Sequence, residues 1–300
     1  MKFKNNNYKL VEDITDFGIT DPITIKVKQF YEEYPFPNYK IDDNKYTLSQ
    51  AGDKNAFSKK LKEFIGFNKS ILEVGSGTSQ LSNYLAIGTN NRVCAFDTSM
   101  KSLKIGNNFA KESNIKNINF IRGDIFDEIF QEEIFDFVLC NGVLHHTKNP
   151  YKAFSNITKC LKKEGYIVVG LYNKIGRFRT KFRKILYKVF GKSLVMLFDP
   201  VLRKIGTKSK DKIEAWIRDQ YEHPVESLHT FDEVLDWFDQ NNIEFINSVP
   251  SCSLSEESEK SFFENNTKGT YLERLFQQLF MIFNKFGSEG GLFIFIGKRR

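Results

Sequence analysis

The sequence has few cysteines and no long apolar run. Its four cysteines include no C-x-x-C pair, and Cys94 and Cys140 lie in apolar stretches that are typical of buried strands. We therefore expect reduced structural thiols in a cytoplasmic protein. The first residues lack the apolar core of a signal peptide. No stretch of about 18 apolar residues occurs either, so we expect no membrane-spanning segment.

Histidine is also scarce, with four in 300 residues. His145 and His146 are adjacent, but no third histidine or carboxylate stands at the spacing of metal ligands, so we expect no metal. The remaining composition, 41% hydrophobic and 27% charged, is ordinary for a globular protein and favours one domain with elaborations. The net charge of +7 permits contact with nucleic acid or anionic lipid, depending on where the charge lies.

Residues 70–80 are the most informative stretch, because an apolar strand runs directly into Gly75 and Gly77 and then into a helical pattern. Glycines at such a turn permit positive φ and let a ligand approach the backbone closely. The dinucleotide-binding pattern G-x-G-x-x-G is not completed, because Gln80 stands at its sixth position, and Glu73 would lie badly beside a pyrophosphate. A cationic ligand suits this carboxylate better.

A second strand ends in Asp97, about 20 residues beyond Gly77, where a carboxylate can bind both hydroxyls of an adenosine ribose. This acid, the strand, Glu73 and the glycines together resemble motif I of the class I S-adenosylmethionine-dependent methyltransferases, whose cofactor carries an ammonium and a sulfonium. The stretch from Asp136 to His146, D-x-V-x-x-x-x-V-L-H-H, is similar to one common in small-molecule members of that superfamily.

The resemblance implies that the chain binds S-adenosylmethionine and releases S-adenosylhomocysteine. Later strand ends add an acid that can accept from the adenine amine, a backbone amide facing that ring, and an amide beside the methionine half. The expected cofactor-binding residues are Glu73, Gly75, Gly77, Asp97, Thr98, Asp124, Ile125, Asn141 and Gly142. One departure is Ser79, which stands where many members have a third glycine.

The resemblance also implies an α/β fold with a doubly wound, Rossmann-like sheet of seven strands, the last antiparallel beside the sixth. The hydrophobic patterns place these strands at 70–75, 92–97, 118–121, 135–140, 165–172, 243–249 and 291–297. The helical patterns cover 23–34, 55–67, 78–87, 99–112, 151–163, 231–240 and 271–286, the last stopped by Gly287.

The domain plan follows from what these elements leave over. We expect residues 1–55 to be an N-terminal arm or cap, with a loosely ordered lead-in over 1–22. Residues 56–300 would be the methyltransferase domain, with helical insertions at 173–228 and 250–289 that form a lid. The aromatic and proline cluster of 30–39 either staples the arm to the domain or roofs the cofactor pocket.

The first insertion is strongly basic, since 171–210 contains twelve lysines and arginines against one acid, Asp199. An apolar stripe recurs within it at helical spacing, at Phe178, Phe182, Ile185, Leu186, Val189 and Phe190. The stripe could pack down as an active-site lid while the basic residues are solvated. Alternatively, the region 174–210 could contact an anionic membrane as a peripheral protein does, and both could hold for an amphipathic substrate.

Methyl transfer from a sulfonium is an in-line displacement that depends on alignment and exclusion of water. A thiol or enolised carbon needs only proximity, whereas an alcohol or phenol needs a base, for which His145, His146 and Tyr172 are candidates. The histidines could equally cap a helix or fix the loop. We expect a small-molecule or lipid-like acceptor; the alternatives are an RNA or protein methyltransferase, or a non-catalytic cofactor-binding module. No RNA-binding signature is present, and the oligomeric state stays open.

Overall fold

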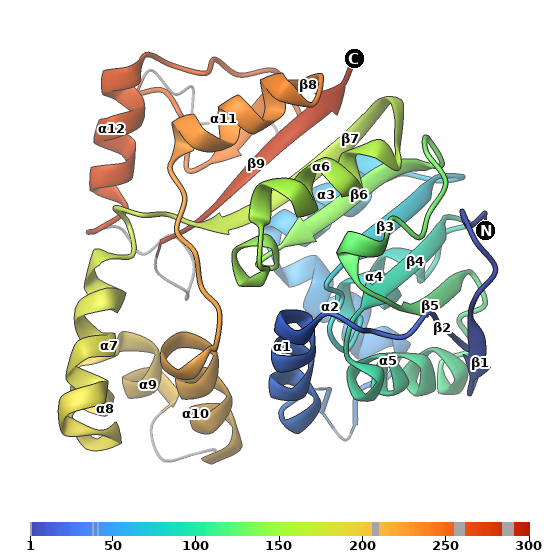
Figure 1. Cartoon of the computed structure of the whole chain (residues 1–300), viewed down its shortest axis with the longest axis horizontal. Helices are drawn as coiled ribbons and strands as arrows, with labels where there is room; N and C mark the ends of the chain where they lie inside the picture. The colour runs from blue at the N-terminus through green and yellow to red at the C-terminus, as the bar shows by residue number, and fades with distance from the viewer. Residues whose placement is uncertain (1, 38, 41, 206–209, 255–261, 284–290) are drawn as a thin grey trace.

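The computed structural model describes the chain except for residues 1, 38, 41, 206–209, 255–261 and 284–290. Its centre is a nine-stranded sheet in the order β1-β2-β5-β4-β3-β6-β7-β9-β8 (Figure 1). The strands are β1 Lys9–Val11, β2 Ile14–Asp16, β3 Ser70–Val74, β4 Arg92–Asp97, β5 Ile118–Arg122, β6 Phe135–Asn141, β7 Leu161–Tyr172, β8 Ile243–Val249 and β9 Leu292–Arg299.

Five neighbouring strands of the sheet, β5, β4, β3, β6 and β7, are parallel to one another. Strand β9 is antiparallel to both of its neighbours, β7 and β8. The doubly wound plan with an antiparallel last strand beside the sixth is therefore confirmed. Parallel strands bring their carboxyl ends to one edge of the sheet, where ligands bind in such folds. The motifs at the ends of β3, β4, β5 and β6 consequently meet.

The expected strand count of seven was too low, and the lead-in is ordered where we expected it to be loose. Residues 9–16 form a hairpin whose second strand pairs in parallel with β5, with Thr15 opposite Ile121. Ile14 is completely buried there. Strands of three residues are too short to show an alternating pattern, so they could not be recognised from the sequence.

Helices cover both faces of the sheet. They are α2 Lys45–Lys54, α3 Ala56–Ile65, α4 Gln80–Ala86, α5 Met100–Glu112, α6 Pro150–Lys159 and α11 Phe231–Gln240, and they are preceded by α1 Pro22–Glu33, which has no buried residue. Alternate residues of β3 separate the two cores: Leu72 packs in one cluster with residues of α6 and α11, and Ile71 packs in another with residues of α2, α3 and α4. This alternation is the period-two pattern of a sheet buried on both faces.

Between β7 and α11 the chain forms a separate group of helices (Figure 1). They are α7 Phe178–Phe190, α8 Lys192–Phe198, α9 Pro200–Ile205, α10 Lys210–Ile217 and the one-turn π-helix η3 Arg218–Glu222. This group has its own small core, made by Val195, Leu202, Ile217 and Tyr221.

The second expected insertion contains α12 Tyr271–Phe280. The helix ends at Phe280, six residues before the expected end at Phe286. Met281 caps it by donating its backbone N–H to the carbonyl oxygens of Gln277 and Leu279. The expected stop at Gly287 lies outside the described residues. Within the described parts of the chain, no helix is long and apolar enough to cross a membrane.

Candidate active site

The turn after β3 depends on two glycines. Gly75 has φ +67° and Gly77 has φ +52°, both in the left-handed region that favours glycine. A Cβ on Gly75 would collide with the Val143 side chain, and one on Gly77 would collide with the Phe36 carbonyl oxygen. Ser79 also adopts a left-handed conformation, with φ +61°, and α4 begins immediately after it.

The carboxyl edge of the sheet is hollowed by a cavity of about 350 Å³, within the usual size range of small-molecule sites. The structure brings together all the residues that the sequence assigned to the cofactor. Those that line the cavity are Glu73, Gly75, Gly77, Asp97, Thr98, Asp124, Ile125, Asn141 and Gly142.

Asp97 holds the glycine turn and the start of α5 at the same time. One carboxylate oxygen accepts the Gly77 N–H at 2.8 Å and the other accepts the Ser99 N–H at 2.8 Å. Burial raises the pKa of this carboxyl above its ordinary value, while the backbone donors oppose that rise. Each oxygen keeps a lone pair for a further donor, so the side chain can accept two hydroxyls of a ligand.

Glu73 lies at the end of β3 and accepts a hydrogen bond from the Ser82 hydroxyl of α4. Burial raises the pKa of Glu73 to about 7, and the charge of Asp97 adds to the rise. No cationic side chain among the described residues pairs with this carboxylate. A partly desolvated carboxylate on a cavity wall without a counter-ion suits a cationic group on a ligand.

Asp124 is buried and begins the short 3-10 helix η1 Ile125–Asp127, where its carboxylate accepts the Phe126 N–H at 3.0 Å. Across the cavity, Gly142 follows β6 with φ +79° and donates its N–H to the Gly170 carbonyl at 3.0 Å. Asp124 follows β5 and Gly142 follows β6, and both line the same cavity. Each is held in place there by a hydrogen bond to a backbone group.

The catalytic candidates separate into two groups. His146 and Tyr172 line the cavity, but His145 does not. His145 is fully buried, with its ring 4.0 Å from that of Tyr172, and burial holds its pKa well below the ordinary value. Of the three candidates for a base, only His146 and Tyr172 therefore reach the cavity, and a catalytic role for His145 stays a prediction. The sequence could not separate two adjacent histidines in η2 Leu144–His146.

His146 has a defined tautomer. Its Nδ1 lies 2.7 Å from the Val225 carbonyl oxygen, which can only accept, so Nδ1 carries the proton and Nε2 is a bare acceptor. The His223 ring stacks on it with 3.6 Å between centroids. Burial lowers the pKa of His146 to about 3, so the ring is neutral across the physiological range.

A protein-family model described as "Methyltransferase domain" matches residues 66–219, which is half of the chain. The chain belongs to this methyltransferase family. Two curated relatives match shorter segments. The ubiquinone biosynthesis O-methyltransferase of Rickettsia akari (strain Hartford) is 30% identical over 104 residues, 35% of this chain and 40% of the relative. The ribosomal protein L11 methyltransferase of Prochlorococcus marinus (strain MIT 9215) is 31% identical over 119 residues, 38% of each protein.

The match thus spans less than half the length of these relatives. Solved structures agree on the fold: the geranyl diphosphate C-methyltransferase of Streptomyces coelicolor A3(2) superposes with a TM-score of 0.53 at 13% identity, covering 94% of this chain and 100% of that one. That structure contains S-adenosyl-L-homocysteine. The carboxylates of Glu73, Asp97 and Asp124 line the cavity of this methyltransferase and fit the cationic and donor groups of S-adenosylmethionine, the cofactor that the sequence predicts.

The N-terminal arm also contributes to the methyltransferase site, through the aromatic and proline cluster of 30–39 for which the sequence left two roles open. The cavity is roofed by Tyr31, Phe36 and Pro37, and the Thr78 N–H approaches the Phe36 carbonyl at 3.4 Å. The aromatic cluster of the arm therefore both staples the arm and roofs the pocket. Its pairing of rings and prolines was the signal for this role.

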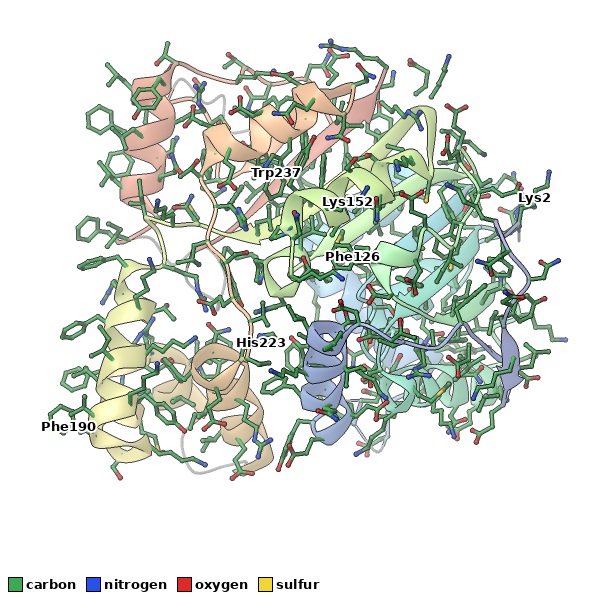
Figure 2. The ribbon with its side chains drawn as sticks, in the orientation of Figure 1. Lys2, Phe126, Lys152, Phe190, His223 and Trp237 are labelled. Atoms are coloured by element: carbon green, nitrogen blue, oxygen red, sulfur yellow. The ribbon has the colours of Figure 1, made fainter. Side chains whose placement is uncertain are left out.

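The segment 218–230, which we call the strap, is the last part of the first insertion together with its link to α11. It carries the remaining two histidines. His223, which is labelled in Figure 2, contacts His146 and the Phe30 ring of α1, with a centroid distance of 5.0 Å to Phe30. His229 is bound by Ser227 and Glu233. Nothing in the sequence around His223 or His229 indicated that all four histidines would gather beside one cavity. Among the described residues, no group of histidines, cysteines and acids could hold a metal ion.

Proposed function

We propose that this methyltransferase transfers a methyl group to a small-molecule or lipid-like acceptor by in-line displacement. The observation that carries the proposal is the apolar part of the cavity lining. Besides the polar groups at the strand ends, the lining includes the apolar and aromatic side chains of Ile23, Val27, Tyr31, Phe36, Tyr172 and Leu292. Such a lining suits an acceptor with apolar or aromatic bulk that enters the cavity and displaces water.

Three carboxylates would hold the cofactor. We assign Glu73 to its ammonium, Asp97 to its ribose hydroxyls and Asp124 to its adenine amine. When bound, S-adenosylmethionine supplies an electrophilic methyl group on a sulfonium. The chain then has to align the acceptor and exclude water, since displacement depends on geometry more than on a strong base.

The strap and α1 supply that enclosure. Arg218 of the strap pairs with Glu33 at 2.9 Å, and its guanidinium lies 3.6 Å from the centre of the Tyr34 ring. On the other side, Ser227 donates its N–H to the His145 carbonyl at 2.8 Å. The strap therefore ties the arm to the loop after β6. The arm and this loop line the cavity.

His146 would bind the acceptor rather than titrate. Its unprotonated Nε2 can accept a hydrogen bond from an acceptor hydroxyl beside Tyr172, whose own hydroxyl accepts from Gln220 Nε2 at 3.1 Å. A histidine with a pKa of about 3 is too weak a base to take a proton fully at neutral pH.

Replacing His146 by leucine should lower kcat by about tenfold, the cost of one hydrogen bond to a reacting group, and leave the affinity for S-adenosylhomocysteine within about twofold. Because the pKa of His146 is about 3, wild-type kcat should show no imidazole titration between about pH 6 and pH 8. Steady-state kinetics across that range, with calorimetry of product binding, measure both quantities.

The control is His229→Gln, which alters a histidine outside the cavity lining and should keep most of the activity. An inflection near pH 6.5 that disappears in His146→Leu would contradict the neutral-acceptor role and restore a general base.

The acceptor class can be tested with methyl-labelled S-adenosylmethionine, the full chain and a cell extract divided into organic-extractable, aqueous small-molecule, RNA and protein fractions. Label should enter one of the first two fractions and vanish with Asp97→Ala. Label in protein, the acceptor class named for the Prochlorococcus relative, or in RNA would overturn the proposal. No transfer to any fraction would favour a non-catalytic cofactor-binding module.

We also propose that the protein works in the cytoplasm. All four cysteines are buried free thiols, and no pair of them is bridged. A reducing compartment preserves such thiols.

A further inference from the structure

Helix α7 carries its apolar face on the outside. The side chains of Phe178, Phe182, Ile185 and Val189 are 57–66% exposed. The opposite face turns inward: Thr180 is buried and accepts a hydrogen bond from Arg183 at 3.0 Å. The apolar stripe therefore does not pack down onto the domain as the lid interpretation expected. A helix of a water-soluble domain normally shows the reverse arrangement.

Helix α12 is inverted in the same way. Its polar residues face the protein: Gln278 is buried and accepts from Asn173 Nδ2 at 2.8 Å, and Arg274 pairs with Asp232 at 2.6 Å. The outward face is apolar, with exposures of 48–75% for Tyr271, Leu272, Phe276, Phe280 and Phe283. Because hydrogen bonds fix the polar side, the helix cannot rotate to bury these rings.

The two inverted helices adjoin. Asn173 and Gly176, just before α7, contact Gln278 and Met281 at the end of α12. Both helices lie along the same edge of the molecule in Figure 1, and Phe190 projects from the outer side of α7 in Figure 2. Exposed aromatic residues thus form one extended face, which we call the α7/α12 face. Extended apolar patches of this kind usually mark a binding surface.

The exposed charge on α7, α8 and α9 has one sign, although Lys192 of α8 pairs with Glu214 of α10 at 3.5 Å. Among the described residues 174–204, the exposed charged side chains are all basic: Lys174, Arg179, Lys181, Lys188, Lys192, Arg203 and Lys204. The acid of this segment, Asp199, is buried and accepts hydrogen bonds from Trp216 and Tyr221. At 100° per residue, Lys181 and Lys188 lie along one edge of the apolar stripe, and Arg179 lies toward its other edge, between Leu186 and Phe190 in angle. Long basic side chains at the edges of an apolar stripe can reach lipid phosphates while the stripe enters the acyl region.

We propose that the α7/α12 face docks the enzyme on an anionic lipid surface, with the apolar rings in the interface and the basic residues at the head groups. The charge distribution decides between occupants. A second copy of the chain would bring the basic flanks of α7 against like charges, whereas an anionic bilayer complements them. The proposal goes beyond methyl transfer and does not depend on the acceptor, although a lipid-like acceptor would be met at such a surface.

The test is sedimentation of the full chain with vesicles of pure phosphatidylcholine or of phosphatidylcholine mixed with phosphatidylglycerol, without cofactor. Wild-type protein should pellet with the anionic vesicles only, and less as ionic strength rises from about 0.05 to 0.5 M. Phe182→Glu and Phe276→Glu should each reduce the partition coefficient at least about tenfold, because a carboxylate replaces a ring that the bilayer would bury. Lys181→Glu with Lys188→Glu should flatten the salt dependence.

Phe67→Glu and Lys116→Glu are matched controls, since both residues are exposed but lie outside the α7/α12 face, and they should bind like wild type. Negligible pelleting with both vesicle types would overturn the proposal. So would a concentration-dependent dimer in light scattering that Phe182→Glu dissociates while vesicle binding is absent, because a second copy would then cover the face. Vesicle binding by a protein that labels no acceptor would leave this inference standing and reject only the proposed activity.

Discussion

Replacing Asp97 by alanine should weaken binding of S-adenosylhomocysteine by at least about 100-fold, because two hydrogen bonds to a charged group are lost at about 1.5 to 3 kcal/mol each. The carboxylate also accepts the Gly77 and Ser99 N–H groups at 2.8 Å, so its loss loosens the glycine turn that borders the same cavity. Calorimetric titration of the full chain with S-adenosylhomocysteine measures the effect directly.

Asp127→Ala is the matched control, because this acid lies in η1 next to the site but does not line the cavity. It should bind the ligand like wild type. Thermal unfolding of Asp97→Ala without ligand separates a folding defect from a binding defect. An unchanged affinity in that variant, or competition by NADH in wild type, would contradict the assignment of Asp97 to the ribose.

Strands β3, β4, β6 and β7 were predictable because most of their residues are buried and each strand contains an apolar run that ends in a turn. The strand from 70 to 75 and the acid at Asp97 illustrate this. Strands and helices alternate in this part of the chain, and the candidate cofactor residues lie at or just after the strand ends. Even the turn at Ser79 was locatable, although its positive φ was not.

Elements outside this alternation of strands and helices were not predictable in the same way. The hairpin of β1 and β2 is too short to show a period, and the capping box of α2, built by Asn44 and Thr47, precedes a helix with little apolar content. His223 reaches the site only through the tertiary path of the strap. The outward face of α12 was also hidden, since sequence periodicity shows that a helix is amphipathic but not which face meets the protein.

Glu73 sets a trade-off between the stability of the empty protein and affinity for the cofactor. Its pKa is raised to about 7 by burial, whereas an unfolded chain would ionise it near its ordinary value of 4.5. The folded state therefore holds a proton that the unfolded state releases between these two values. Stability from this group is fully present below about pH 4.5 and is lost as pH rises to about 7, after which the loss stays constant.

Replacing Glu73 by glutamine should remove that loss, because the amide keeps the shape and never ionises. The difference in free energy of unfolding between Glu73→Gln and wild type, both without ligand, should be near zero at about pH 4.5 and grow to about 1 to 3 kcal/mol in favour of the variant at pH 8. At the same time, affinity for S-adenosylhomocysteine should fall by about tenfold to 100-fold, because the ammonium loses its counter-ion. In wild type, affinity should rise between about pH 5.5 and pH 7.5 as the carboxyl ionises, and the variant should lack this rise.

Denaturant titration at several pH values and calorimetry on the same samples measure both halves of the trade-off. Glu112→Gln, at the exposed end of α5, is the control that should change neither quantity. If Glu73→Gln were less stable than wild type at pH 8, the carboxylate would be compensated in the folded state, and its assignment to the cofactor ammonium would lose its physical basis. If stability rose but affinity stayed the same, Glu73 would be a strained structural acid, and the ammonium would have to bind elsewhere in the cavity.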